Sequence, residues 1–72
     1  MLDPLEMMVR QEEREHLTGA IRRLPETERM VLRMVDIEGF SESDTASCAA
    51  MPMAKVRSAL ARAREMLKAR LA

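Results

Sequence analysis

Apolar residues recur at intervals of three or four along most of the chain, which is the spacing of an amphipathic helix. The first such stretch has Pro4 at its first helical position and stops before Pro25, because the residue preceding a proline is pushed out of the helical region. Residues 11–16 within it are polar on every side. We therefore expect a helix that ends at Leu24 and whose residues 1–16 form a loosely docked lead-in.

A second amphipathic stretch starts at Pro25 and ends at Gly39, a residue type that favours the left-handed turn closing a helix. Ser41 then provides the cap of a third, short helix. Phe40, the single aromatic residue, lies between these two helices and is predicted to anchor in the core. Small side chains follow on the third helix, and Cys48 among them is predicted to be buried.

A break at residues 50–52 separates the third helix from a last helix that starts near Met53 and runs to the C-terminus. Its predicted inner face comprises Val56, Leu60, Ala63, Leu67 and Leu71. A short helix, a tight turn and a longer helix in this order are typical of a helix-turn-helix. The pattern thus predicts an all-α fold: a single four-helix domain over residues 1–72 with a C-terminal helix-turn-helix and no wing.

Charge is distributed unevenly, although the 12 basic and 12 acidic side chains cancel overall. Residues 1–47 carry six basic and eleven acidic side chains, whereas residues 48–72 carry six basic side chains and only Glu65. This polarity suggests a basic face for an anionic partner. A solvated helix of mixed charge is the simpler interpretation for a lone cationic helix, but the helix-turn-helix order before it favours a binding face.

The composition excludes several classes of function. No apolar run reaches the roughly 18 residues that span a bilayer, and the single cysteine favours a reducing cytoplasm. His16 is the lone histidine, so we expect no metal site around it. Neighbouring acids such as Glu26 and Glu28 do not face each other on a helix, and we expect both to be solvated. We predict neither an enzyme nor a bound cofactor.

The last helix supplies the candidate binding residues, because the second helix of a helix-turn-helix lies in the DNA major groove. Lys55, Ser58 and Arg62 share one outward strip, and these residue types suit base edges and phosphates. Other cations lie further round the helix, where flanking phosphates would pass. The predicted DNA-binding set is Ala54, Lys55, Arg57, Ser58, Ala59, Arg62, Arg64 and Lys68.

Several short motifs occur in a fixed order along the chain: LPETERMVL at 24–32, DIEGFS at 36–41, DTA at 44–46, VRS at 56–58 and ARAREML at 61–67. In this order they resemble domain four (region 4) of bacterial RNA polymerase sigma factors, and most closely the extracytoplasmic-function (ECF) class of the sigma-70 family. The resemblance covers nearly the whole chain, and the ordered set at the right spacing is specific although each fragment alone is weak.

This resemblance implies both a fold and a function. In that family the last helix reads the minus-35 promoter element in double-stranded DNA, and the domain docks on the β-subunit flap of the RNA polymerase core. Members also bind anti-sigma factors, and they work in the cytoplasm. Because the family's promoter-melting domain is not among these residues, we expect the chain to be a fragment of a longer sigma factor rather than a stand-alone protein.

Departures from the family pattern cluster on the DNA side. Ala50 stands where the family has a turn glycine, and a left-handed backbone there would cost alanine about 1–2 kcal/mol. Ala54 replaces another glycine, Ala59 replaces an arginine and Thr45 replaces a core isoleucine. The sequence therefore leaves an alternative open: a sigma-like protein-interaction domain that binds an anti-sigma factor without reading DNA. A third possibility is the DNA-binding domain of a LuxR-type regulator, against which the RAR motif at 62–64 argues.

Overall fold

The computed structural model describes residues 15–71, and every regular element in that range is helical. The first helix covers residues 15–22 of this range and is followed by α2 (Glu26–Leu32), η1 (Arg33–Ile37), α3 (Glu42–Ala49) and α4 (Met53–Leu71). Since η1 continues α2 directly, residues 15–71 form four helices, and the all-α prediction with a helix-turn-helix in α3 and α4 is confirmed. The predicted lead-in helix falls mostly outside the described residues.

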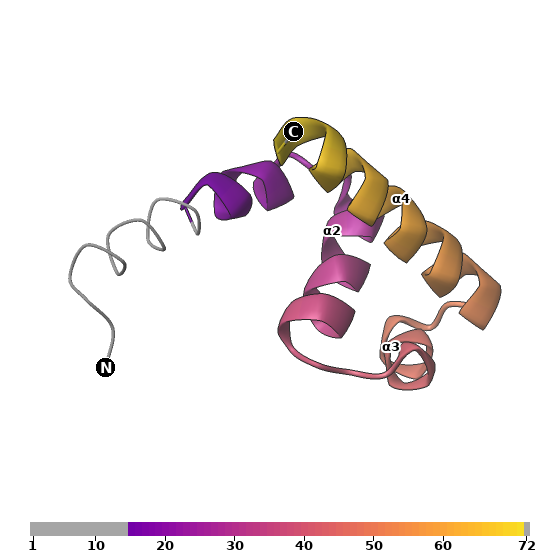
Figure 1. The fold of residues 1–72 in the computed structure, drawn as a ribbon. Coiled ribbons are helices and arrows are strands. Elements are labelled where there is room, and N and C mark those ends of the chain that lie inside the picture. Colours follow the sequence, from indigo (N-terminus) through magenta and orange to yellow (C-terminus); the bar gives the residue numbers. More distant parts are fainter. Residues whose placement is uncertain (1–14, 72) are drawn as a thin grey trace, which may run out of the picture.

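Among the described residues, helix α4 is the longest element, and the other helices are arranged along it (Figure 1). Helix α2 crosses beneath its middle, α3 lies near its N-terminal end, and the first helix lies near its C-terminal end (Figure 1). Within residues 15–71, no helix is both long enough and apolar enough to cross a membrane.

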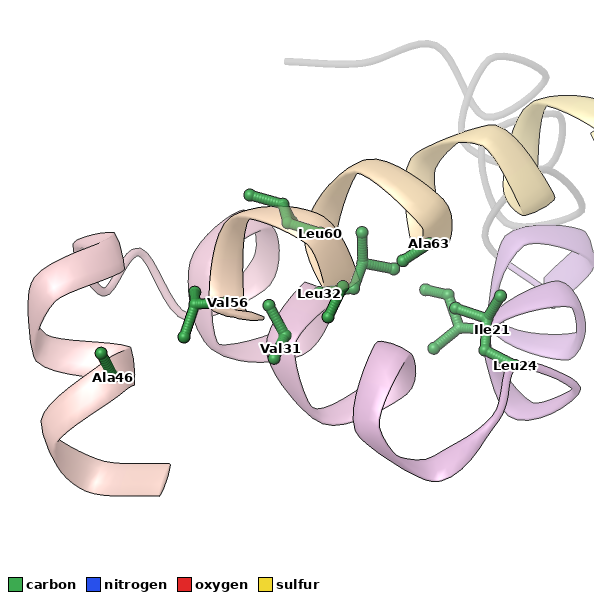
Figure 2. Close-up of a cluster of buried hydrophobic side chains, with 9 residues drawn as sticks. Ile21, Leu24, Val31, Leu32, Ala46, Val56, Leu60 and Ala63 are labelled. Carbon is green, nitrogen blue, oxygen red and sulfur yellow. The ribbon is translucent and has the colours of Figure 1, made fainter. Parts of the chain in front are cut away.

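The hydrophobic core lies where α2 meets α4 (Figure 2). Val31 and Leu32 of α2 pack against Val56, Leu60 and Ala63 of α4, as the helical spacing predicted for the α4 face. Alanines at several of the buried positions remove bulk between the helices and allow a close approach. The predicted face is too long at its C-terminal end, because Leu71 is 42% exposed.

The boundary between the first helix and α2 follows the prediction made from Pro25. The first helix closes with two short turns, in which the backbone N–H groups of Arg23 and Leu24 donate to carbonyls three residues earlier. Pro25 occupies the N-cap of α2. Arg29 then reaches back, and its Nη1 donates to the carbonyl of Arg22 at 3.2 Å. This contact occupies a carbonyl at the end of the first helix, a group that has no partner within its own helix.

The second helix does not end as one regular α-helix. Its last five residues form a π-helical turn, closed by a hydrogen bond from the Glu38 N–H to the Arg33 carbonyl at 2.8 Å. A π turn holds one more residue than an α turn, so it rotates Asp36 relative to a regular helical wheel. Gly39, at φ 82°, ends the helix as predicted. Phe40 is 42% exposed rather than anchored in the core, because the short link to α3 runs over the surface.

The turn between α3 and α4 is a Schellman motif. In this motif the N–H of Met51 donates to the Ala46 carbonyl at 2.9 Å, and the N–H of Ala50 donates to the Ser47 carbonyl at 3.3 Å. Ala50 itself is left-handed, with φ 53° and ψ 46°. At the other end of α3, Ser41 accepts the predicted capping bond from the Asp44 N–H at 2.9 Å.

Two side chains of α3 explain how this short helix packs. Thr45 is fully buried and donates its hydroxyl to the Ser41 carbonyl at 2.8 Å. The buried polar group is therefore satisfied inside the helix. Cys48 is exposed, and its predicted burial is wrong, because the buried face of α3 is set by Thr45 and Ala46.

We expect Ala50→Gly to stabilise the domain by roughly 0.5–1 kcal/mol. Alanine in the left-handed region costs about 1–2 kcal/mol, and the larger entropy of glycine in the unfolded chain offsets about half of that gain. Thermal unfolding followed by circular dichroism should show a midpoint higher by roughly 2–8 °C. The matched control is Ala61→Gly at an exposed position inside α4, which should lower the midpoint. A lower midpoint for Ala50→Gly would contradict the left-handed assignment.

Candidate DNA-binding face

Helix α4 begins directly after the Schellman turn, with Pro52 as the residue before it. The carbonyl of Pro52 accepts from the N–H groups of Lys55 (3.0 Å) and Val56 (3.1 Å), which starts the helix without a side-chain cap. One face of α4 is buried against α2 and α3, and the opposite face is open to solvent. The α3–turn–α4 unit therefore presents one free helical face of a helix-turn-helix.

Seven of the eight predicted binding residues are exposed on α4. Lys55, Ser58 and Arg62 are spaced by three and four residues, so they lie along one side of the exposed surface. A second group, with Arg57, Arg64 and Lys68, lies along the other side at spacings of seven and four residues. Ala54 is exposed between these groups. The structure thus presents two cationic edges, and the exposed strip between them holds small side chains and the acid Glu65.

Ala59 does not belong to this exposed surface, which corrects the predicted set. Its side chain is fully buried. The physical reason is helical phase: Ala59 lies three residues after Val56 and four before Ala63, and both of these face the core. The alanine at this position therefore serves the packing of α4 and presents nothing to a ligand.

Each of the three arginines in the predicted set is paired with an acid from another helix. The pairs are Arg57 with Glu42 of α3 (3.0 Å), Arg62 with Glu28 of α2 (3.1 Å) and Arg64 with Asp36 of η1 (2.8 Å). Sequence reasoning did not identify these acids, and it placed Glu28 in solvent, whereas that residue is only 9% exposed. Nothing in the local sequence signals a contact between residues 28 and 62, because only the crossing of α2 and α4 brings them together.

The pair between Arg64 and Asp36 has the most complete geometry. Nε of Arg64 donates to Oδ2 at 3.1 Å and Nη2 donates to Oδ1 at 2.8 Å, so the guanidinium and the carboxylate meet through two parallel bonds. These hydrogen bonds, together with the charge of Arg64, hold the pKa of Asp36 below its ordinary value of 3.8, although partial burial opposes them. The same bonds raise the pKa of Arg64.

We expect Asp36→Asn to lower the free energy of unfolding at neutral pH by less than about 1 kcal/mol, because both partners are substantially exposed. The folded-state pKa of Asp36 is depressed, so the pair stabilises the domain above pH 3.8 and this contribution is lost as the pH falls through the folded-state value. Urea unfolding across a pH series should show the two proteins converging at acid pH. Glu38→Gln serves as the control, and a difference that persisted at the lowest pH would contradict the assignment.

Residues 15–71 hold no group of three or more histidine, cysteine, aspartate or glutamate side chains placed to bind a metal ion. The exposed surface of α4 includes Glu65 and the apolar Met66, but cations, a hydroxyl and small side chains make up most of it. These groups bind by charge and hydrogen bonding, which is the chemistry of nucleic-acid phosphates and base edges.

The fold and this face define a helix-turn-helix protein of the DNA-binding class. The family model described as "Sigma-70, region 4" matches residues 14–67. The chain belongs to the sigma-70 region 4 family, a family of DNA-binding domains in transcription rather than of enzymes. In sigma factors generally, region 4 recognises the minus-35 promoter element. No curated protein matches the chain.

Proposed function

We propose that this chain reads a minus-35 promoter element, as the region 4 domain of an ECF-type sigma factor that directs RNA polymerase to initiate transcription in the cytoplasm. The observation that carries the proposal is the strip formed by Lys55, Ser58 and Arg62 on the free face of α4. The site of base readout would be this strip, and membership of the region 4 family supports it.

The second cationic edge of α4 suits phosphates. Lys68 is exposed, and Arg57 and Arg64 are exposed while paired with carboxylates. Cations along the edges of a recognition helix position it on the duplex without reading sequence. Because Ala59 is buried, the proposed contact set on DNA comprises seven residues: Ala54, Lys55, Arg57, Ser58, Arg62, Arg64 and Lys68.

A protein partner is favoured by a separate observation. Ile37 and Phe40 are 58% and 42% exposed. A groove of about 320 Å³ on α2 and η1 has Met30 and Met34 in its lining, together with the charged side chains of Glu26, Arg29, Arg33 and Glu38. Large exposed apolar side chains of this kind mark contact surfaces for proteins. The β-subunit flap of the RNA polymerase core is the partner proposed for this surface, and an anti-sigma factor is the alternative.

The alternative function requires only this protein-binding surface and no contact with DNA. In it the chain is a sigma-like interaction domain that binds an anti-sigma factor and does not read DNA. The alanine at Ala54 and the buried Ala59 leave few side chains for reading bases, which favours the alternative. The cations at Lys55 and Arg62 favour promoter recognition.

The test is fluorescence anisotropy of the 72-residue chain with a pool of short duplexes at several salt concentrations. Promoter recognition predicts that some duplexes are preferred and that log K falls against log salt with a slope of roughly −3 or steeper, at about 0.9 for each phosphate contact. Circular dichroism establishes that the chain is folded under the same conditions. Absence of binding by the folded chain at the lowest salt would favour the interaction domain.

A further inference from the structure

Glu28 occupies an unusual position at the start of α2. It is the third residue of the helix, where an acid commonly accepts a hydrogen bond from the N–H of the N-cap residue. The N-cap here is Pro25, and proline has no N–H. The carboxylate of Glu28 therefore lacks its usual partner within the helix and is available to another element.

That carboxylate is turned inward, toward α4. The side chain of Glu28 is 12% exposed, and its Oε1 accepts from Nε of Arg62 at 3.1 Å. A carboxylate removed from water in this way requires a cation or a hydrogen-bond donor. Arg62 supplies both, and its own side chain remains 57% exposed. One end of the pair is therefore fixed in the protein while the other extends into solvent.

The part of Arg62 that is held differs from the part that would read a base. Glu28 contacts the Nε edge, and within residues 15–71 neither Nη group of Arg62 forms a hydrogen bond. Recognition of guanine by arginine uses two parallel N–H donors directed at O6 and N7. A guanidinium has five N–H donors in a rigid plane, so fixing the Nε edge also fixes the direction of the two Nη groups.

The other two arginine pairs of α4 are not anchored in this way. Their acids, Glu42 and Asp36, have side chains 40% and 36% exposed, three times the value for Glu28. The single bond from Arg57 to the exposed Glu42 gives little orientation, whereas Asp36 occupies both the Nε and one Nη donor of Arg64 through two parallel bonds. Arg62 is thus the arginine of the predicted set whose direction is fixed from the core.

We propose that Glu28 is a positioning residue that orients Arg62 for the recognition of a guanine in the DNA element. The proposal rests on the proposed function, because it needs α4 to read DNA. It has a distinctive consequence. Glu28 brings a negative charge near the DNA, so its neutralisation should leave overall affinity unchanged or higher while sequence preference falls.

The variant to test is Glu28→Gln, which keeps the shape of the side chain and removes its charge. Anisotropy is measured with the preferred duplex and with duplexes that differ from it at single base pairs, using the 72-residue chain. We expect the preference for the best duplex to fall about threefold or more, toward the value for Arg62→Ala. Binding to unrelated duplexes should be equal or tighter.

Glu65→Gln is the matched control, since it removes the same charge from the exposed surface of α4. Within the part of the chain that the structure describes, Glu65 forms no ion pair, so its replacement frees no arginine. It should raise affinity for all duplexes alike and leave the preference unchanged. Equal loss of preference in both variants would overturn the proposal, because the effect would then come from charge alone.

A second measurement follows the pair without DNA. Nitrogen-15 NMR of the arginine side chains should show slow solvent exchange at Nε–H of Arg62, and this protection should be lost in Glu28→Gln. The reference is Arg70, for which the structure gives no ion pair among residues 15–71. Exchange at Arg62 as fast as at Arg70 in the parent chain would overturn the proposal.

These outcomes distinguish failure of the positioning role of Glu28 from failure of the proposed promoter recognition. If Arg62→Ala removes the preference and Glu28→Gln does not, the positioning role of Glu28 is wrong and promoter recognition stands. If the folded parent chain binds no duplex, the proposed function fails and the role of Glu28 in reading fails with it. A protected Nε–H in that case would reduce the pair to a structural contact between α2 and α4.

Discussion

Leu60→Ala is expected to remove a large share of the stability of this domain. Leu60 is 4% exposed and lies where α4 packs on α2, near Val31 and Val56 (Figure 2). Truncation of a buried leucine to alanine typically costs about 2–5 kcal/mol, because transfer energy is lost and a cavity remains. A chain of this length has a total stability of only about 4–11 kcal/mol, so one such cavity takes a large share.

Urea unfolding followed by far-ultraviolet circular dichroism measures this loss. The control is Leu71→Ala, the same substitution on the same helix at a position that is 42% exposed. It should change the free energy of unfolding by no more than about 0.5 kcal/mol. Equal midpoints for the two variants would contradict the placement of Leu60 at the centre of the core.

Arg62→Ala is expected to abolish most of the sequence preference of the domain while leaving the fold intact. A bidentate contact between arginine and guanine is worth about 1–3 kcal/mol of discrimination, so the preferred duplex should lose roughly fivefold to 150-fold relative to others. The substitution also leaves Glu28 without its partner, and the carboxylate is largely buried. Some loss of stability is therefore expected beside the loss of preference.

Two further variants separate charge from readout. Arg62→Lys retains a cation for Glu28 but lacks the planar pair of donors, so it should preserve stability and lose preference. Lys68→Ala should weaken binding to all duplexes alike and reduce the salt slope by about 1, because it removes a phosphate contact. If Arg62→Ala kept the parent preference in anisotropy titrations, the assignment of the reading strip would be wrong.

Local chemistry explains why the helices were predictable. Pro25 fixes a boundary through its own ring, Gly39 adopts φ 82° where other residues are strained, and Ser41 caps α3 with its own hydroxyl. Each of these effects acts within about four residues of the chain. The helical repeat likewise places Val56 and Leu60 on one face of α4, and the motifs that indicated region 4 are read from consecutive residues.

Interactions between helices decided what the local pattern left open or placed wrongly. The π turn rotates Asp36 relative to a regular helix, and the surface link leaves Phe40 exposed. Ala59 shares the helical phase of Val56 and Ala63, but it is the position of α2 and α3 around α4 that buries it completely. Burial depends on where a second helix lies, which residue order along one helix does not specify.

The same distinction between local chemistry and interactions between helices applies to the binding face on α4. Its cations, the polarity of charge between the two halves of the chain and the helix that carries them were all determined by the sequence alone. Which of those arginines is held, and by which acid, was decided by tertiary structure. Glu28 and Arg62 are separated by 34 residues and meet only because α2 crosses α4. Such contacts follow from the packing of the core, because an ion pair of this kind cannot form until the helices have been brought together.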